Sequence, residues 1–244
     1  MAAYNQVQTL DEAASAQLLD NPIWNALTTD HAHLAVGDGC ARRYPEEIGP
    51  LSGMPTQSAE GYEALRPLAG TRGVVALFFR EAPRVPADWK LLRGGKIHQM
   101  IADRPLMAPL SSPTGAGLRR LGAADAQAMV ALAELTEPGP FRLRTLELGN
   151  FFGVFQEGRL MAMAGKRMHL PGCIEVSAVC THPEARGRGY ARMLMSRVMD
   201  EIVQSGRVPF LHTFADNHGA IRLYESLGFA VRQSFELAVV KRED

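Results

Sequence analysis

A glycine-rich loop in the second half of the chain has the composition of a phosphate-binding site. The segment Val179-Cys-Thr-His-Pro-Glu-Ala-Arg-Gly-Arg-Gly-Tyr-Ala191 predicts the end of a strand, a proline-containing turn and a loop that opens an amphipathic helix. Main-chain N–H groups and the dipole at such a helix terminus attract a phosphate. Gly187 and Gly189 permit close approach of the backbone because they carry no Cβ atom, and Arg186 and Arg188 add positive charge.

The spacing of the glycines argues against two familiar phosphate-binding loops. A Walker loop ends in Gly-Lys-Ser or Gly-Lys-Thr, and the segment contains neither. The dinucleotide fingerprint needs a third glycine three residues after the second, and Arg192 occupies that position. Taken alone, the loop is also compatible with a tight turn that binds nothing.

Two signatures together resemble the GNAT superfamily of acyl-CoA-dependent N-acyltransferases. Arg186-Gly-Arg-Gly-Tyr-Ala191 matches its Arg/Gln-x-x-Gly-x-Gly/Ala signature, and 217–229 is similar to its second signature, N-x-x-A-x-x-x-Y-x-x-x-G-F. The resemblance covers roughly residues 118–240. Within it, the sequence of residues 177–191 is similar to the branch related to glycine N-acyltransferases. It implies an α/β fold with a mixed, mostly antiparallel splayed sheet flanked by helices, and an acetyl-CoA donor.

The resemblance also implies which residues hold the cofactor. In such enzymes the strand before the loop splays from its neighbour, and its backbone holds the pantetheine arm like an added strand. The loop amides would bind the pyrophosphate, and Asn217 would contact the arm. The expected cofactor contacts are Val179, Cys180, Thr181, Arg186, Gly187, Arg188, Gly189, Tyr190, Ala191, Arg192 and Asn217.

Two further residues match catalytic positions of the superfamily. Tyr224 matches the tyrosine that protonates the departing CoA thiolate, and a phenol with an ordinary pKa of about 10 is still protonated at neutral pH. An alkylamine is mostly ammonium at that pH, so a base is needed as well. Glu175 lies eleven positions before Arg186, the spacing at which some members place a glutamate base, directly or through a water.

Each of these roles has a structural alternative. Tyr224 could be a core aromatic residue of a short helix, and Glu175 could be a salt-bridged or edge-strand residue. Cys180 is expected to be a small buried strand residue, because direct transfer to an amine needs no covalent intermediate. His212 lies within an apolar strand and is expected to be a hydrogen-bonded core residue.

The second half of the chain predicts alternating strands and helices that position these residues. Expected strands are 118–121, 151–155, 159–168, 174–181, 208–215 and 231–240, and expected helices are 125–135, 190–205 and 220–227. Alternation along 174–181 places Glu175 on one face with Ser177 and Val179. The opposite face then collects the apolar residues Ile174, Val176, Ala178 and Cys180.

The first half has fewer periodic segments and no recognised signature. Residues 10–19 and 22–27 predict helices, 73–79 predict a buried strand, and prolines interrupt the remainder. The Pro- and Gly-rich stretch 109–117 predicts a linker, placed at 111–117. We therefore expect a divergent region at 1–110 and a GNAT acyltransferase domain at 118–244. In the resembling branch the first half is often a degenerate second copy, which the length permits.

Composition narrows the function classes. Hydrophobic residues make up 46% of the 244 residues, and Lys+Arg and Asp+Glu are both 26, so no net charge attracts nucleic acid or an anionic membrane. Neither a signal peptide nor a membrane-spanning stretch is read, and three widely spaced cysteines suggest no disulfide framework, so a cytoplasmic protein is expected. His31, His33 and Cys40 only faintly resemble metal ligands, and no metal is expected.

The sequence therefore predicts an N-acyltransferase that transfers an acetyl group from acetyl-CoA to an amine by direct attack. A small-molecule amine is the expected acceptor because the resembling branch acts on small amines. A protein or peptide N-acetyltransferase and a CoA-binding module without catalysis are the alternatives. The acceptor, the acyl chain length, the purpose of residues 1–110 and the oligomeric state stay open.

Overall fold

The computed structural model of the protein describes residues 17–102 and 117–243. The helix predicted at 10–19 falls within this range only at 17–19, which are helical. The rest of that prediction lies outside the described residues. The same holds for the predicted linker at 111–117, apart from Gly117, which begins a strand.

Eight strands of the described residues form one sheet, which is antiparallel except for one neighbouring pair. Their order across the sheet is β3 (Val74–Phe79), β10 (Ala230–Arg242), β4 (Trp89–Ile101), β9 (Val208–Phe214), β8 (Cys173–Thr181), β7 (Arg159–Leu170), β6 (Phe151–Gln156) and β5 (Gly117–Leu121). With the helices that flank it, this sheet confirms the predicted mixed α/β fold.

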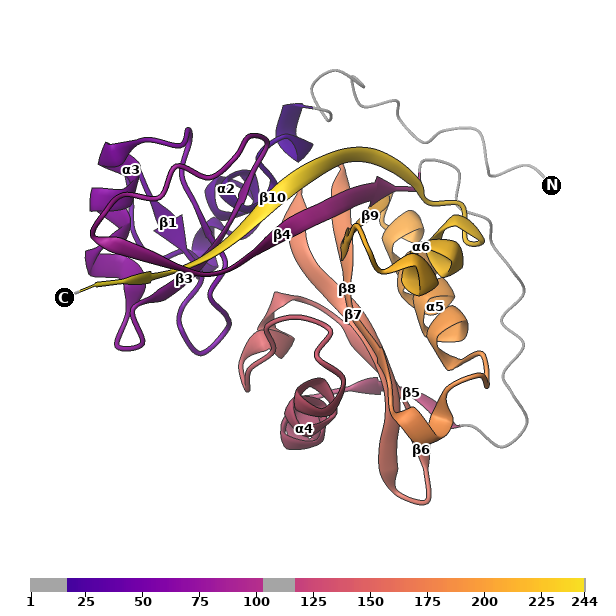
Figure 1. Ribbon diagram of the computed structural model, residues 1–244. Helices are drawn as coiled ribbons and strands as arrows, with labels where there is room; N and C mark the ends of the chain where they lie inside the picture. The colour runs from indigo at the N-terminus through magenta and orange to yellow at the C-terminus, as the bar shows by residue number, and fades with distance from the viewer. Residues whose placement is uncertain (1–16, 103–116, 244) are drawn as a thin grey trace.

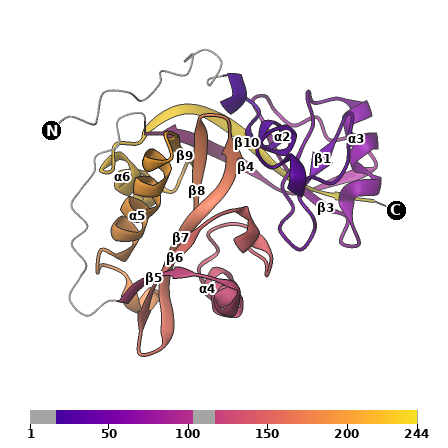
Figure 2. The ribbon, with the colours of Figure 1, turned by 180° about the vertical axis from the view of Figure 1, so that it is seen from behind.

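Helices cover the sheet on opposite faces, as the two ribbon views in Figures 1 and 2 show. The longest, α5 (Tyr190–Gln204), packs beside α6 (His218–Glu225), and α4 (Ala126–Thr136) lies across the other face. The apolar residues of α5 recur at spacings of three and four, so Leu194, Val198 and Ile202 are fully buried. This packing fixes the start of α5, where the glycine-rich loop ends.

A bulge in β8 overturns the predicted alternation of its side chains. Ala178 has a positive φ of 51°, and the register against β7 shifts beside it. Ile174 and Val176 pack in the core under α5, whereas Ala178 and Cys180 pack in the core under α4. The prediction that these four residues share a face was therefore wrong, because the extra residue of a bulge reverses the alternation.

The parallel strands β8 and β9 separate soon after they meet. They pair only at three positions, from Cys173 opposite Val208 to Glu175 opposite Phe210. Beyond Glu175 the backbone of β8 has no β9 partner on that side. The gap opens toward the ends of the two strands that carry Val179 and Phe214.

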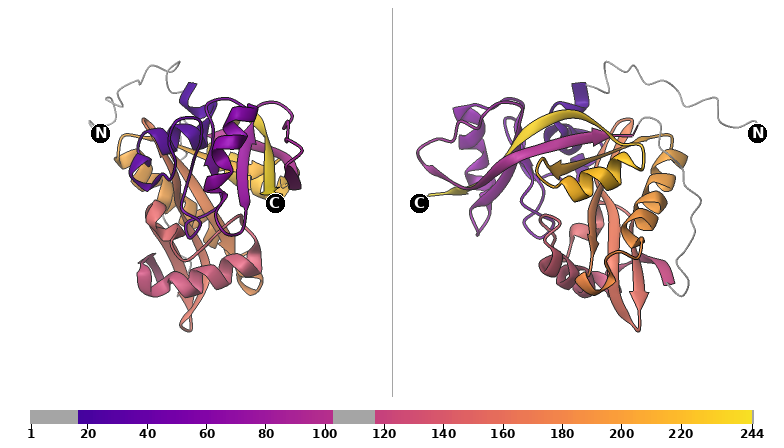
Figure 3. Two further views of the ribbon diagram at one scale, coloured as in Figure 1. Left: turned by 90° about the vertical axis from the view of Figure 1, so that its left-hand side faces the viewer. Right: turned by 45° about the vertical axis from the view of Figure 1, so that its right-hand side comes forward.

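The first half of the chain contributes two strands to the same sheet. The long strands β4 and β10 arch together from one end of the molecule to the other in Figure 1, and Figure 3 shows the arch from two further sides. β4 lies between β9 and β10 and pairs with both. The sheet therefore takes strands from both sides of the predicted linker.

The remaining elements of the first half are short. They are α2 (Pro22–Thr28), β1 (Arg42–Arg43), β2 (Ser52–Gly53) and α3 (Ala59–Leu65), together with the 3₁₀ turns η1 (Ala32–Leu34) and η2 (Pro67–Ala69). Further 3₁₀ turns in the second half are η3 (Ala123–Asp125), η4 (Thr145–Leu148) and η5 (Pro183–Ala185). A degenerate second copy of the fold stays a prediction.

The described residues contain no helix typical of a membrane span and no side-chain cluster typical of a metal site. None of the described helices is long and apolar enough to cross a membrane. Residues 17–102 and 117–243 also contain no group of three or more His, Cys, Asp or Glu side chains arranged to hold a metal ion. His31, one of the faint candidates, instead contacts the Tyr44 hydroxyl through Nδ1 at 2.8 Å and is buried.

Candidate active site

A cavity of about 230 Å³ opens where β8 and β9 separate. Val179 and Tyr224 line it from the second half of the chain, and Phe78 and Ile97 line it from the first half. Residues of the segment 137–140, which follows α4, line another side. The cavity is thus built jointly by the two halves, and it contains several of the residues that the sequence singled out.

The glycine-rich loop presents a row of main-chain donors at the start of α5. Gly187 and Gly189 both have φ of 78°, a conformation that favours glycine, and Gly189 is the residue before the helix. The first helical bond runs from the Met193 amide to the Gly189 carbonyl at 3.1 Å. The amides of residues 187–192 donate a hydrogen bond to no described residue, so they are available to an anion.

The arginines of the loop differ in their surroundings. Arg188 donates to Oε1 of Gln156 at 3.0 Å and to the Glu184 carbonyl at 3.2 Å. Arg192 donates to the Ser226 hydroxyl at 2.5 Å. Arg186 is exposed and makes no ion pair with a described residue. The three guanidinium groups add positive charge around the free amides.

Tyr224 of α6 and Asn217, the residue before that helix, line the cavity. Tyr224 is 9% exposed, and burial raises the pKa of its phenol to about 12. Its hydroxyl makes no hydrogen bond with a described residue, while its ring packs against Phe229. Asn217 caps α6 by accepting a hydrogen bond from the Ala220 amide at 3.2 Å, which leaves its side-chain NH₂ group available.

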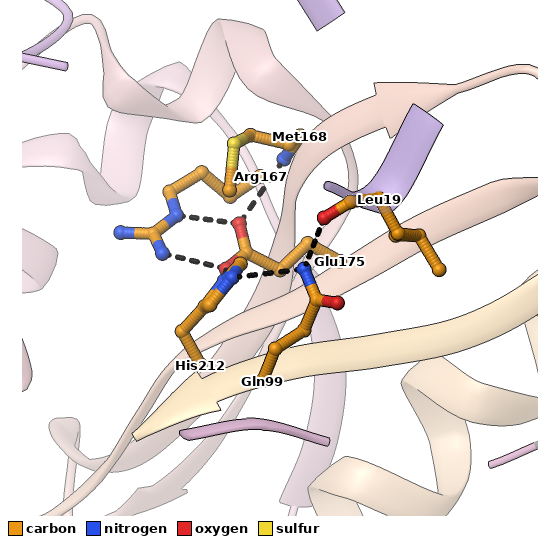
Figure 4. A network of polar contacts seen from close by, with 6 residues as sticks. All are labelled: Leu19, Gln99, Arg167, Met168, Glu175 and His212. Atoms are coloured by element: carbon orange, nitrogen blue, oxygen red, sulfur yellow. Dashed lines mark hydrogen bonds and ion pairs between the residues drawn. The ribbon is translucent and has the colours of Figure 1, made fainter. Parts of the chain in front are cut away.

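Glu175 lies fully buried beneath the cavity and is not among the residues that line it. Its two carboxylate oxygens each accept a hydrogen bond of 2.6 Å from Arg167, and one also accepts from Nδ1 of His212 at 2.7 Å (Figure 4). Burial on its own would raise the pKa of Glu175, but Arg167 and His212 outweigh it and hold the pKa at about 2.

The hydrogen bonds of His212 determine its tautomer. Nδ1 donates to Glu175, and Nε2 accepts from the Gln99 amide at 3.2 Å. Gln99 keeps this orientation because its NH₂ group also donates to the Leu19 carbonyl and its oxygen accepts from Arg232, at 3.0 Å each. Burial lowers the pKa of His212, so the neutral ring is favoured. The expectation of a hydrogen-bonded core histidine is confirmed.

Arg167 connects this buried network to the cavity. Its Nε and Nη2 atoms bond to Glu175, whereas Nη1 donates to no described residue and the side chain lines the cavity. Sequence reasoning missed both Arg167 and Gln99. No motif contains either residue, and only the register of β7 against β8 and of β4 against β9 brings them to Glu175.

The remaining predicted residues lie at the edge of the site or outside it. Cys180 is buried in the core under α4, and burial raises the pKa of its thiol to about 11, which suits a packing role. Thr181 is paired with Ala162 of β7. The structure therefore brings Val179, Asn217 and Tyr224 together at the cavity and places residues 186–192 at the start of α5, of which Tyr190, Ala191 and Arg192 form the first turn.

Comparisons with known sequences point to one group of proteins. The model of a family described as FR47-like protein matches residues 151–237. The chain is also 30% identical over 106 residues to the mycothiol acetyltransferase of Nocardiopsis dassonvillei. That match covers 39% of this chain and 32% of the relative, so the chain corresponds to about a third of the curated protein.

Solved structures extend the likeness to nearly the whole chain. A protein from Novosphingobium aromaticivorans, described as an acetyltransferase from the GNAT family, has a TM-score of 0.84 and 38% sequence identity, with 93% of this chain and 99% of that one covered. A GCN5-related N-acetyltransferase from Kribbella flavida has a TM-score of 0.59 at 16% identity, over 96% and 95% of the two chains. The second likeness concerns the fold alone.

Proposed function

The chain belongs to the GNAT family and is an acetyl-CoA-dependent acetyltransferase, and from that premise we propose that its acceptor is a primary amine on a small molecule. The observation that carries the proposal is the cavity between β8 and β9. Tyr224 lines it together with residues of both halves of the chain. A small, partly open cavity shared by the two halves suits a small acceptor better than an extended protein segment.

The residues present fit acetyl-CoA. The free amides between Gly187 and Arg192 and the nearby arginines suit a diphosphate, and the unpaired edge of β8 beyond Glu175 suits an arm that bonds to main chain. Asn217 offers an available side-chain NH₂ group beside this edge. When bound there, acetyl-CoA supplies an activated acetyl group to the cavity.

Tyr224 acts in this proposal as the proton donor to the sulfur. Burial keeps the phenol protonated across the neutral range, and its hydroxyl is not engaged by any described residue. A proton that reaches the sulfur as the bond to carbon breaks makes the thiolate a better leaving group. These two features support the role that the second signature implies.

Glu175 contributes in this proposal by holding Arg167. The prediction that it takes the proton of the amine stays a prediction, and its surroundings favour a different role. A carboxylate with a pKa of about 2 and no exposed surface is a weak proton acceptor. Its two short bonds instead fix the Arg167 guanidinium at the edge of the cavity.

The residues that line the cavity support a small acceptor. Leu51, Ala76 and Phe78 of the first half contribute apolar side chains to its lining. The name of the curated relative, mycothiol acetyltransferase, also points to a small acceptor. The experiment must distinguish a small-molecule acceptor from a protein acceptor.

The experiment is a thiol-release assay with acetyl-CoA and a panel of amino acids, polyamines and short peptides. We expect calorimetry to detect acetyl-CoA binding and at least one small primary amine to give rapid thiol release with formation of its N-acetyl product. Transfer confined to peptides would replace the small acceptor with a protein or peptide. Acetyl-CoA binding without transfer to any amine would contradict the proposed reaction.

A further inference from the structure

Glu137 is the one carboxylate among the described residues that line the cavity. The other charged or titratable side chains that face the same space are Arg93, Arg167, His212 and Tyr224. Glu137 follows directly after α4, is exposed, and makes no ion pair with a described residue. The family signatures in the sequence do not include it.

The backbone of Glu137 is held in an unfavourable conformation. Its φ and ψ are 48° and 50°, the left-handed region that glycine usually occupies after a helix. The end of α4 accounts for this conformation, and a non-glycine residue there carries some backbone strain. Of the three described non-glycine residues with positive φ, Ala178 lines the same cavity and Glu157 lies in the β6–β7 hairpin turn, whose geometry explains it.

The chain around Glu137 restricts the position of its backbone. Its amide donates to the Ala133 carbonyl at 2.8 Å, which closes the last turn of α4. The next three residues, Pro138, Gly139 and Pro140, also line the cavity, and the prolines restrict the backbone. Glu137 thus lines the cavity from a restricted stretch of backbone at the end of a helix.

The other groups at the cavity cannot take a proton from an incoming amine as readily. The oxygens of Glu175 are occupied by Arg167 and His212, and Glu175 does not line the cavity. Both ring nitrogens of His212 are engaged. Arg93 and Arg167 carry only donors. On the basis of the proposed function, we propose that Glu137 is the catalytic residue that receives the proton of the acceptor amine.

The proton balance assigns Glu137 and Tyr224 different tasks. An ammonium acceptor loses two protons as it becomes an amide, while the carbon–nitrogen bond forms and the carbon–sulfur bond breaks. Glu137 takes the first proton, directly or through a water, and releases it to solvent. The second proton passes to Tyr224 and replaces the one that Tyr224 gives to the sulfur. The products are the N-acetyl amine, the CoA thiol and one proton in solution.

The test compares substitutions of two exposed glutamates that both have a positive φ. Glu137→Gln removes the carboxylate at the cavity, and Glu157→Gln removes one from an exposed residue that also has positive φ but lies outside the cavity. The acceptor is the amine of the panel that the parent enzyme acetylates fastest, and kcat/KM is measured by thiol release from pH 6 to pH 10. Calorimetry with acetyl-CoA checks the donor site in each variant.

We expect Glu137→Gln to lower kcat/KM about 100-fold at pH 7 and to regain much of the loss near pH 10, where more of the acceptor is already deprotonated. The acetyl-CoA Kd should not change, and Glu157→Gln should keep the parental profile. A second variant, Glu137→Gly, relieves the backbone strain and should show the same loss of activity with an undiminished Tm.

Several results would overturn the assignment of Glu137. One is an unchanged kcat/KM at pH 7 in Glu137→Gln, and another is a loss that stays constant across the pH range. An equal loss in Glu157→Gln would show that the position of the carboxylate does not matter. If the parent acetylates none of the amines, the proposed function itself fails, and the two failures are thereby distinguished.

Discussion

At the scale of single residues, neighbours decide what a side chain can do. Glu175 is a charged residue inside a mostly apolar strand, which calls for an explanation. The explanation in the structure is a set of short bonds to Arg167 and His212. Because none of those partners is adjacent in sequence, spacing along the chain predicted the position of Glu175 and not its surroundings.

Substitution of Glu175 separates the two roles considered for it. Glu175→Gln leaves the guanidinium of Arg167 buried without its carboxylate, which should lower the free energy of unfolding by about 3 kcal/mol. We expect a lower Tm and a loss of activity that does not recover at alkaline pH. Thermal unfolding and a pH–rate profile measure both. Alkaline recovery with an unchanged Tm would instead support the base predicted from sequence.

Tyr224 gives a second prediction for one residue. Tyr224→Phe removes only the hydroxyl, which bonds to no described residue, so the fold should tolerate it. We expect kcat to fall about 100-fold while the acetyl-CoA Kd stays near the parental value, because the proton donor acts only during transfer. Steady-state kinetics and calorimetry separate the two effects. An unaltered kcat would exclude Tyr224 as the acid.

At the scale of elements, periodicity predicted most of the second half. The strands and helices that flank the glycine-rich loop occur close to their expected bounds, since their apolar residues recur at spacings of two or of three and four. Two features left no such pattern. The bulge at Ala178 depends on pairing with β7. β4 has an exposed stretch near its start, from Lys90 to Gly94, in which Leu91 and Leu92 are adjacent and do not alternate with polar residues.

The start of α5 carries a prediction for the loop. Gly189→Val places a β-branched residue at φ of 78°, where a Cβ atom would meet no other atom within 4 Å. The cost is therefore backbone strain of about 1–3 kcal/mol, and any relaxation of the loop turns its amides away from a diphosphate. Calorimetry should show a large loss of acetyl-CoA affinity in a protein that remains folded.

Gly206 provides the matched control for that substitution. It lies just beyond the other end of α5, has φ of 75°, and also has open space around a Cβ position. Gly206→Val should lower Tm by a similar amount and leave acetyl-CoA affinity unchanged. Equal affinity in Gly189→Val and the parent would mean that the diphosphate binds elsewhere.

At the scale of the whole molecule, buried histidines join the two halves of the chain. His31 of the first half stacks on His169 of β7 with ring centroids 4.7 Å apart, and His212 of β9 bonds to Gln99 of β4. Burial, with smaller effects of neighbouring charges, lowers the pKa of His31 to about 3 and that of His169 to about 4. Burial also lowers the pKa of His212.

These shifts predict that acid weakens the junction. Each histidine has an ordinary pKa near 6.5 when unfolded, so its contribution is complete above that pH and is lost as the pH falls toward the folded values. Tm should therefore fall steeply from pH 7 to pH 5. His169→Phe keeps a ring against His31 and removes the buried Nε2 that lacks a hydrogen bond, so its Tm should depend less on pH. Calorimetric scans would contradict this if the two slopes were equal.

The position of β4 determines whether the second half can fold alone. A fragment of residues 118–244 lacks the strand that pairs with β9 at 210–214 and with β10 along its length. Both strands would then present unpaired edges, and Ile97 and Met100 would be missing from the interior. We expect the fragment to aggregate and to bind no acetyl-CoA.

A cut chain provides the control for that fragment. Proteolysis within 103–116 leaves the strands of the described residues uncut, and the two pieces should stay associated because β4 is held on both sides by β9 and β10. Size-exclusion chromatography and calorimetry on the cut protein should match the parent. A soluble 118–244 fragment that binds acetyl-CoA with the parental Kd would instead show that the sheet does not need β4, and the predicted boundary would then separate two independent domains.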